Sequence, residues 1–180
     1  MRLFGLSTRD NCIISLCAAV IAIMAQIMIP LPLGVPVTLQ TFAIVLSGII
    51  LGSKKGVFTV LVYLLLGTVG LPVFHGFTGG IQAFVSPTGG FLLSFPIMAW
   101  FSGQSASKFC QSKGQFVINL FAGVSLNLLA GMFIFKFLTD CTLTAAFAAC
   151  ILPFLPTTVI QVVLGAVIGL RIRRQLVYII

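Results

Sequence analysis

The chain has 180 residues, of which 59% are hydrophobic and only 7% are charged, and its mean hydropathy is +1.23. A soluble domain carries about 25% charged residues, so this composition excludes a water-soluble fold and predicts an integral membrane protein. The net charge of +8 would suggest nucleic-acid binding in a soluble chain, but the placement of the basic residues argues against it.

Apolar segments long enough to approach a membrane span recur between short polar connections. They predict an all-α membrane protein with six transmembrane helices in one bundle and a single domain over residues 1–180. The second and third segments are shorter than the roughly 20 residues of a standard span, which leaves re-entrant hairpins as an alternative. The six segments cover about 11–29, 36–52, 56–71, 90–107, 115–138 and 143–170.

Every second connection between these segments is basic. By the positive-inside rule the basic connections and both termini face the cytoplasm, and the connections 30–38, 72–89 and 139–142 face outward. Lys136 lies just before the last of these outward connections. The basic residues on the cytoplasmic side are Arg2, Arg9, Lys54, Lys55, Lys108, Lys113, Arg171, Arg173 and Arg174.

The first outward connection, IPLPLGVPVTLQ at 29–40, contains Pro30, Pro32 and Pro36 and no charge. Proline fixes the backbone and removes N–H donors, so this loop is expected to be a rigid, apolar wall. Pro36 is expected near the first turn of the second helix, where a missing N–H costs little.

The second outward connection, PVFHGFTGGIQAFVSPTGG at 72–90, is longer than packing alone requires and rich in glycine. Its apolar side chains would cost free energy in water, which favours a packed, functional loop over a loose connection. We hypothesise that residues 74–86 move and close over a ligand. The apolar side chains are Phe74, Phe77, Ile81, Phe84 and Val85.

Acid–base and metal chemistry have few candidate residues. The sequence contains no Glu, two acids (Asp10 and Asp140) and one histidine (His75), so it is not expected to be an enzyme. Five cysteines without C-x-x-C spacing predict neither a disulfide framework nor a metal site, and no cofactor is expected. No phosphate-binding G-x-x-x-x-G-K-[ST] motif occurs, so any ATP that drives transport binds another subunit.

Uncharged polar residues within the predicted spans are therefore the candidates for binding. Any single one can instead hold two helices together by hydrogen bonds. Those near the outward ends are the better candidates, because a cavity beneath the two outer loops would be lined there. The predicted ligand-binding residues are Thr158, Gln161, Gln82, Thr88, Gln40 and His75.

Three stretches carry a resemblance to a known family: 25–42 (AQIMIPLPLGVPVTLQTF), 63–74 (YLLLGTVGLPVF) and 86–91 (SPTGGF). In this order they resemble the BioY family, the biotin-specific S components of energy-coupling-factor (ECF) transporters. The resemblance covers most of the chain. It implies a multi-pass protein of the bacterial plasma membrane that binds biotin from outside. It also implies partners, namely a transmembrane T subunit and two ATPase subunits.

One family motif is changed in this chain. BioY proteins typically carry Pro-Gly-Asp-x-x-Lys at the start of the sixth helix, and the resemblance implies that its acid and base contact the ligand. The matching run here is PTTVIQ at 156–161, which places Thr158 and Gln161 at the two ligand positions. Both charges are lost together, so no unpaired ion remains. The ureido group of biotin has N–H donors and a carbonyl acceptor. A threonine hydroxyl could accept a hydrogen bond from a ureido N–H, and a glutamine amide could donate one to the ureido carbonyl. Alternatively, this corner only packs.

Two small-residue pairs suggest close helix approach. Ala18 and Ala22 resemble the alanine-rich face with which S components dock the T subunit, although packing inside the bundle is an equal alternative. Gly165 and Gly169 repeat the spacing in the sixth segment. For the whole chain, the leading function is biotin binding for uptake. A different heterocyclic ligand on the same fold and a membrane assembly protein without ligand remain alternatives.

Overall fold

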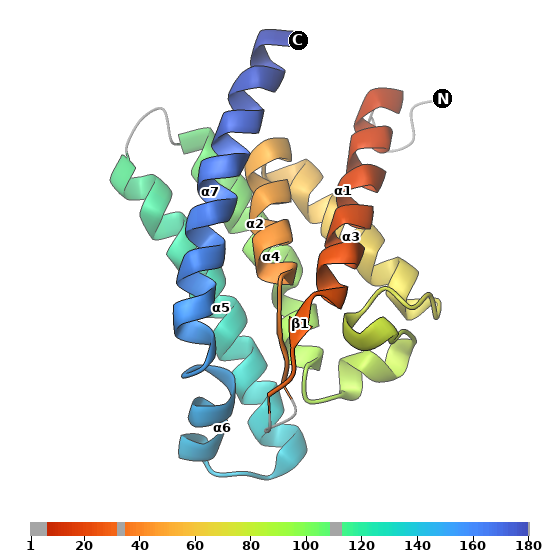
Figure 1. Ribbon diagram of the computed structural model, residues 1–180, viewed down its shortest axis with the longest axis vertical. Coiled ribbons are helices and arrows are strands. Elements are labelled where there is room, and N and C mark those ends of the chain that lie inside the picture. The colour runs from red at the N-terminus through yellow and green to blue at the C-terminus, as the bar shows by residue number, and fades with distance from the viewer. Residues whose placement is uncertain (1–6, 32–34, 109–112, 180) are drawn as a thin grey trace.

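The computed structural model describes residues 7–31, 35–108 and 113–179. Within them the chain forms helices and one two-stranded hairpin, and both termini lie at one end of the molecule (Figure 1). The elements in chain order are α1 (Thr8–Gln26), β1 (Met28–Ile29), β2 (Val37–Thr38), α2 (Gln40–Leu51), α3 (Ser53–Thr68), η2 (His75–Phe77), η3 (Ile81–Val85), α4 (Gly89–Lys108), α5 (Lys113–Thr139), α6 (Leu143–Cys150) and α7 (Phe154–Ile179).

The first five predicted segments each correspond to one helix, α1 to α5, whereas the sixth is divided. The segment predicted at about 143–170 forms the short helix α6 and the long helix α7. Pro153 explains the break, because the residue before a proline is disfavoured in the helical region. Pro156 lies in the first turn of α7, where no backbone N–H is needed.

Helices α2 and α3 are short, as the sequence predicts. Their 12 and 16 residues correspond to about 18 Å and 24 Å, less than the roughly 30 Å of a hydrocarbon core. They are joined at Gly52, whose φ of 79° lies in the region that glycine adopts most readily. By length and apolar character, α1, the Gly114–Thr139 part of α5 and the Phe154–Gln175 part of α7 are long enough to cross a membrane, among the described residues.

Glycines let α2 pack closely against its neighbours. A Cβ at Gly165 or Gly169 of α7 would lie 3.2 Å and 3.0 Å from Val45 and Ile49 of α2. The second small-residue pair therefore packs α7 against α2 inside the bundle. Ile49 has no exposed surface, so the contact belongs to the core.

The first small-residue pair is also turned largely inward. Ala18 is 1% exposed and belongs to the buried stripe of α1, while Ala22 is half-buried. Helix α1 packs this stripe against α2 and α3. In this conformation Ala18 is packed within the bundle, and docking of a T subunit at Ala18 and Ala22 stays a prediction.

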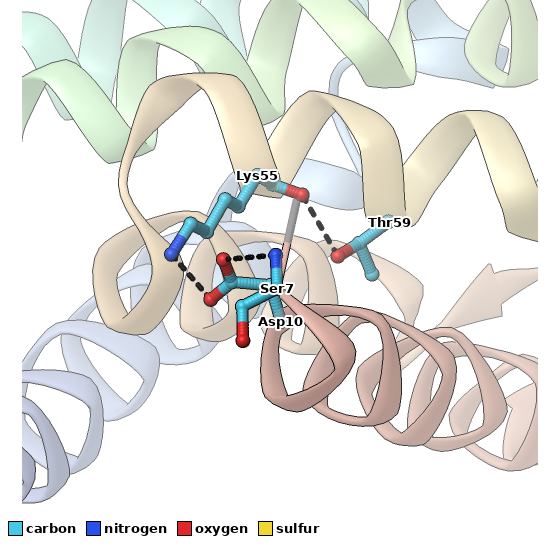
Figure 2. Close-up of polar contacts among 4 residues, drawn as sticks. All are labelled: Ser7, Asp10, Lys55 and Thr59. Atoms are coloured by element: carbon cyan, nitrogen blue, oxygen red, sulfur yellow. Dashed lines mark hydrogen bonds and ion pairs between the residues drawn. The ribbon is translucent and has the colours of Figure 1, made fainter. Parts of the chain in front are cut away.

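Charged groups gather at the end of the molecule that holds the termini. There, Lys55 at the start of α3 forms an ion pair with Asp10 on α1 at 2.5 Å, and Asp10 also accepts a hydrogen bond from the Ser7 N–H (Figure 2). Arg173 of α7 donates to the Ile49 carbonyl, one of the unpaired carbonyls at the end of α2. At the other end, the connections between α1 and α2 and between α3 and α4 contain no Asp, Glu, Lys or Arg, whereas the connection between α5 and α6 contains Asp140.

The two outer connections differ from expectation in detail. In the proline-rich one, β1 and β2 pair with Met28 opposite Thr38. Pro36 therefore precedes β2 and lies before, not within, the first turn of α2, while Pro32 lies outside the described residues. In the glycine-rich connection Phe74 is fully buried and Phe84 is half-buried. Three of the apolar side chains that we expected to pack are at least 70% exposed: Phe77, Ile81 and Val85.

Candidate functional site

A narrow cavity lies where the two outer connections meet the ends of the helices. Its volume, as the space open to the centre of a water-sized sphere, is about 40 Å³. Its wall is built from four parts of the chain: the β2–α2 region, the glycine-rich loop with the start of α4, the middle of α5 and the start of α7. The residues that line it are Val35, Pro36, Thr38, Gln40, Thr41, His75, Thr88, Phe91, Leu92, Phe95, Asn127, Leu128, Phe154, Thr158 and Gln161.

Five of the six residues predicted to bind a ligand line this cavity: Gln40, His75, Thr88, Thr158 and Gln161. The sixth, Gln82, does not. It is exposed on η3 and donates to the Gly79 carbonyl at 2.8 Å, because the tight turn directs its side chain back along the loop. Depth and helical face therefore predicted which residues of α2 and α7 line the cavity, and His75 and Thr88 of the glycine-rich loop line it as well. The direction of the Gln82 side chain within that loop was beyond such reasoning.

Gln161 connects the cavity to α2. Its Oε1 accepts a hydrogen bond of 3.1 Å from the Phe42 N–H, which belongs to the first turn of α2 and has no partner within that helix. Only an oxygen can accept from this N–H, so the orientation of the amide is fixed. No described group accepts from the Gln161 Nε2, which remains available as a donor. Gln161 lines this cavity and also a more open one beside β1 and β2.

Asn127 of α5 has the opposite orientation. Its Nδ2 donates to the Phe91 carbonyl at 3.0 Å and to the Ser94 hydroxyl at 2.7 Å, so both N–H bonds are directed at α4. Its Oδ1 has no partner among the described residues, and Asn127 is 3% exposed and lines the cavity. Two residues that line the cavity thus each keep one amide atom without a partner among the described residues, the Nε2 of Gln161 as a donor and the Oδ1 of Asn127 as an acceptor.

Gln40 is held in place by its neighbours. Its Nε2 donates to the Tyr63 hydroxyl at 2.7 Å, and its Oε1 accepts from the Thr38 hydroxyl at 2.8 Å. Tyr63 in turn donates to the Val73 carbonyl, at the start of the glycine-rich loop. Through these bonds Gln40 links the proline-rich connection, α3 and, by way of Tyr63, the glycine-rich loop. Because both ends of its amide are paired, the main role of Gln40 is to hold the cavity wall in place.

His75 and Thr88 close the cavity from the glycine-rich loop. The His75 Nε2 lies 3.1 Å from the Thr88 hydroxyl, which is also 2.9 Å from the Ser86 hydroxyl. Burial lowers the pKa of His75 from its ordinary value of 6.5, so the imidazole is neutral at neutral pH. The loop therefore adds a neutral group to the cavity.

Thr158 and three aromatic rings complete the wall. Thr158 is 6% exposed, and its hydroxyl has no partner among the described residues. Phe91 and Phe154 stack with ring centroids 5.7 Å apart, and Phe95 lies one turn after Phe91 on α4. The site combines oriented neutral donors and acceptors with flat apolar surfaces. This arrangement can bind a small heterocycle, and it contains no pair of groups suited to acid–base catalysis.

Three polar lining residues were absent from the predicted site: Thr38, Thr41 and Asn127. An asparagine in the middle of a long apolar segment is costly in a membrane unless it has a role, and this signal marks Asn127. Thr41 follows Gln40 at the start of α2 and shares its depth. Thr38 lies in a loop, where only the fold places it at the cavity.

Comparison with known proteins gives a consistent result. The BioY family profile matches residues 1–178. The chain is 38% identical to the biotin transporter BioY2 of Lactococcus lactis subsp. cremoris over 168 residues, covering 91% of this chain and 90% of that protein. It is 30% identical to the probable biotin transporter BioY of Pyrococcus horikoshii, covering 93% and 98% of the two chains.

The fold is also known from experiment. A crystal structure described as the S-component for biotin from an ECF-type ABC transporter matches with a TM-score of 0.84 and 27% identity, covering 94% of this chain and 95% of that one. Together with the profile match over almost the whole length, these similarities place the chain in the BioY family.

Proposed function

We propose that this protein is the biotin-binding membrane subunit of a biotin uptake system. The observation that carries the proposal is the oriented pair in the cavity, with a donor at the Gln161 Nε2 and an acceptor at the Asn127 Oδ1. The ureido group of biotin has one carbonyl and two N–H groups, so it complements such a pair. The relatives named as biotin transporters support the same assignment.

The assignment of groups follows from the bonds already made inside the protein. In the proposed complex Gln161 donates to the ureido carbonyl, because its oxygen is engaged by Phe42. Asn127 and the Thr158 hydroxyl accept from the two N–H groups. The stacked rings of Phe91 and Phe154 provide an apolar surface for the sulfur-containing ring.

Entry of the ligand requires the wall to move. The cavity has room for a few water-sized groups, which is less than a bicyclic vitamin occupies. The glycine-rich loop is the part of the wall best suited to move, because it joins α3 and α4 through turns with positive φ at Gly70, Gly76 and Gly80. We retain the hypothesis that part of 74–86 opens and then closes over biotin.

The neutral lining separates this chain from the family pattern and motivates a second candidate. Thr158 and Gln161 stand where the family motif has an acid and a base, so neither residue at this corner offers the ligand an ionised group. Neutral hydrogen bonds are about half as strong as charge-assisted ones, so biotin binding should be retained but weaker, or supported by other residues. None of the residues that line the cavity is a lysine or arginine that could pair with the biotin carboxylate. The same change would suit a different, uncharged heterocyclic ligand.

The proposal extends to the membrane topology and to the partner subunits. Basic residues at the end with the termini favour a cytoplasmic location of that end, with the cavity opening outward across a plasma membrane and the bundle crossing it six times. As an S component, the chain would work with a transmembrane T subunit and two ATPase subunits, because it has no nucleotide-binding motif of its own.

Binding of labelled biotin to the purified protein tests the function. Biotin and biotinamide are expected to compete about equally, whereas pantothenate and riboflavin are expected to compete far less. If pantothenate or riboflavin displaces the label as well as biotin does, or if biotin does not bind at all, biotin recognition is contradicted. In that case a screen of neutral heterocycles would test the second candidate.

A further inference from the structure

Gln26, the last residue of α1, joins this helix to the glycine-rich loop. Its Nε2 lies within hydrogen-bonding distance of three carbonyls, those of Ala22 (3.1 Å), Val73 (3.4 Å) and Phe74 (3.0 Å). Its Oε1 accepts from the Phe77 N–H at 2.9 Å. One partly buried amide is therefore hydrogen-bonded both to the last turn of its own helix and to the two sides of a turn that lies 47 to 51 residues further along the chain.

The turn held by Gln26 is strained. Gly76 has a φ of 66°, and the next residue, Phe77, has a φ of 55°, a conformation that is unfavourable for a residue with a side chain. The turn is also closed by the hydrogen bond from the Phe74 N–H to the Thr78 carbonyl, at 2.9 Å. Such a backbone conformation persists only where surrounding contacts hold it. The bond from the Phe77 N–H to Gln26 is one of them.

His75 lies inside this turn. The residue before it, Phe74, is fully buried and contacts the rings of Tyr63 and Phe84 edge-to-face. Gln26 holds the backbone on both sides of His75, at Phe74 and at Phe77. The imidazole is thereby directed at Thr88 on the cavity wall.

We propose that Gln26 is a positioning residue for ligand binding, which fixes the turn at 73–77 to α1 and so places His75 at the cavity. The inference rests on the proposed function for its effect on the ligand. It also narrows the moving segment, because residues 73–77 are the fixed end of the loop and the movement belongs to the residues that follow.

A double-mutant cycle tests the proposal. Gln26→Leu removes all of these hydrogen bonds and is expected to weaken biotin binding about tenfold, as is His75→Ala. If Gln26 acts through His75, the double variant should bind biotin with the same affinity as the single variant that binds it less tightly. Losses that multiply to about a hundredfold would overturn the proposal, because the two residues would then act independently.

Gln26→Glu is a second variant in case the leucine variant does not fold. The carboxylate can still accept from the Phe77 N–H but cannot donate to the Phe74 carbonyl, so a binding loss of the same direction is expected. Thr139→Val is the matched control. Thr139 is also the last residue of a helix at this end of the bundle, but its hydroxyl donates only to its own helix at Phe135, so binding should be unchanged.

Hydrogen exchange of the protein without ligand tests the anchor separately from the ligand. The Phe77 amide is expected to be protected in the wild type and to exchange at least tenfold faster in Gln26→Leu, with no change in Thr139→Val. Equal exchange in the wild type and Gln26→Leu would overturn the anchoring role. A wild-type protein that shows the protection but binds no biotin would contradict the proposed function and leave the anchor standing.

Discussion

The two ends of α2 are both held by α7, but with different chemistry. At the end near the termini the charged Arg173 donates to the Ile49 carbonyl, and at the cavity end the neutral Gln161 accepts from the Phe42 N–H. Ionised groups are stable where water reaches them and costly in an enclosed site. The comparison indicates that a charged side chain joins α7 to α2 at the end near the termini. At the cavity end a neutral amide joins the same two helices and keeps one group available for a ligand.

The largest expected difference between the two ends concerns two asparagines of α5. Asn127→Leu removes the proposed ligand acceptor and should weaken biotin binding about 100-fold. Asn119→Leu makes the same change two turns nearer the other end, where the Asn119 Nδ2 is buried without a hydrogen-bond partner among the described residues. It should leave affinity within about threefold and stability equal or higher. If Asn127→Leu and Asn119→Leu lose biotin affinity equally, the cavity end does not differ from the other end in ligand binding.

The next effect separates the two roles of Gln161. Gln161→Met removes both the acceptor for Phe42 and the ligand donor, so it should lower the stability of the protein by about 1–3 kcal/mol and biotin affinity about tenfold. Gln161→Glu keeps an acceptor at the positive end of the helix dipole but loses the donor. It should retain thermal stability and still lose affinity. A glutamate variant that binds biotin normally would exclude Gln161 as the donor.

A smaller effect is expected from pH. Because burial lowers the pKa of His75, the unfolded state takes up the proton at a higher pH than the folded state does. Stability should therefore fall as the pH decreases through 6.5. His75→Asn should weaken this dependence, as measured by the thermal midpoint at pH 7.5 and 5.5. The same fall in both proteins would mean that other groups cause it.

The smallest effect is expected at the charged end. Asp10→Asn keeps an oxygen for the Ser7 N–H but removes the charge that pairs with Lys55 (Figure 2). Exposed ion pairs contribute little, so the thermal midpoint should fall by less than about 3 °C and biotin affinity should not change. A clear loss of biotin affinity would show that the charged end influences the cavity and that the two ends are not independent.

Much of the helical organisation could be predicted from the sequence, because apolar runs and their polar boundaries are local signals. The segment expected at about 90–107 is helix α4 at Gly89–Lys108. The division of 143–170 was missed although Pro153 marks it, since hydropathy alone does not register a proline. The orientation of Gln161 could not be predicted, because its partner Phe42 lies 119 residues away along the chain.

Composition and charge placement determined by themselves that this protein belongs in a membrane, that one end of it is basic and that its candidate binding groups are uncharged. Family resemblance added the ligand. Only the tertiary structure decided which atoms of those groups remain free: Phe42 engages the oxygen of Gln161, and α4 engages the nitrogen of Asn127. The physical reason is that an amide offers both a donor and an acceptor, and packing between distant segments decides which of the two stays unpaired.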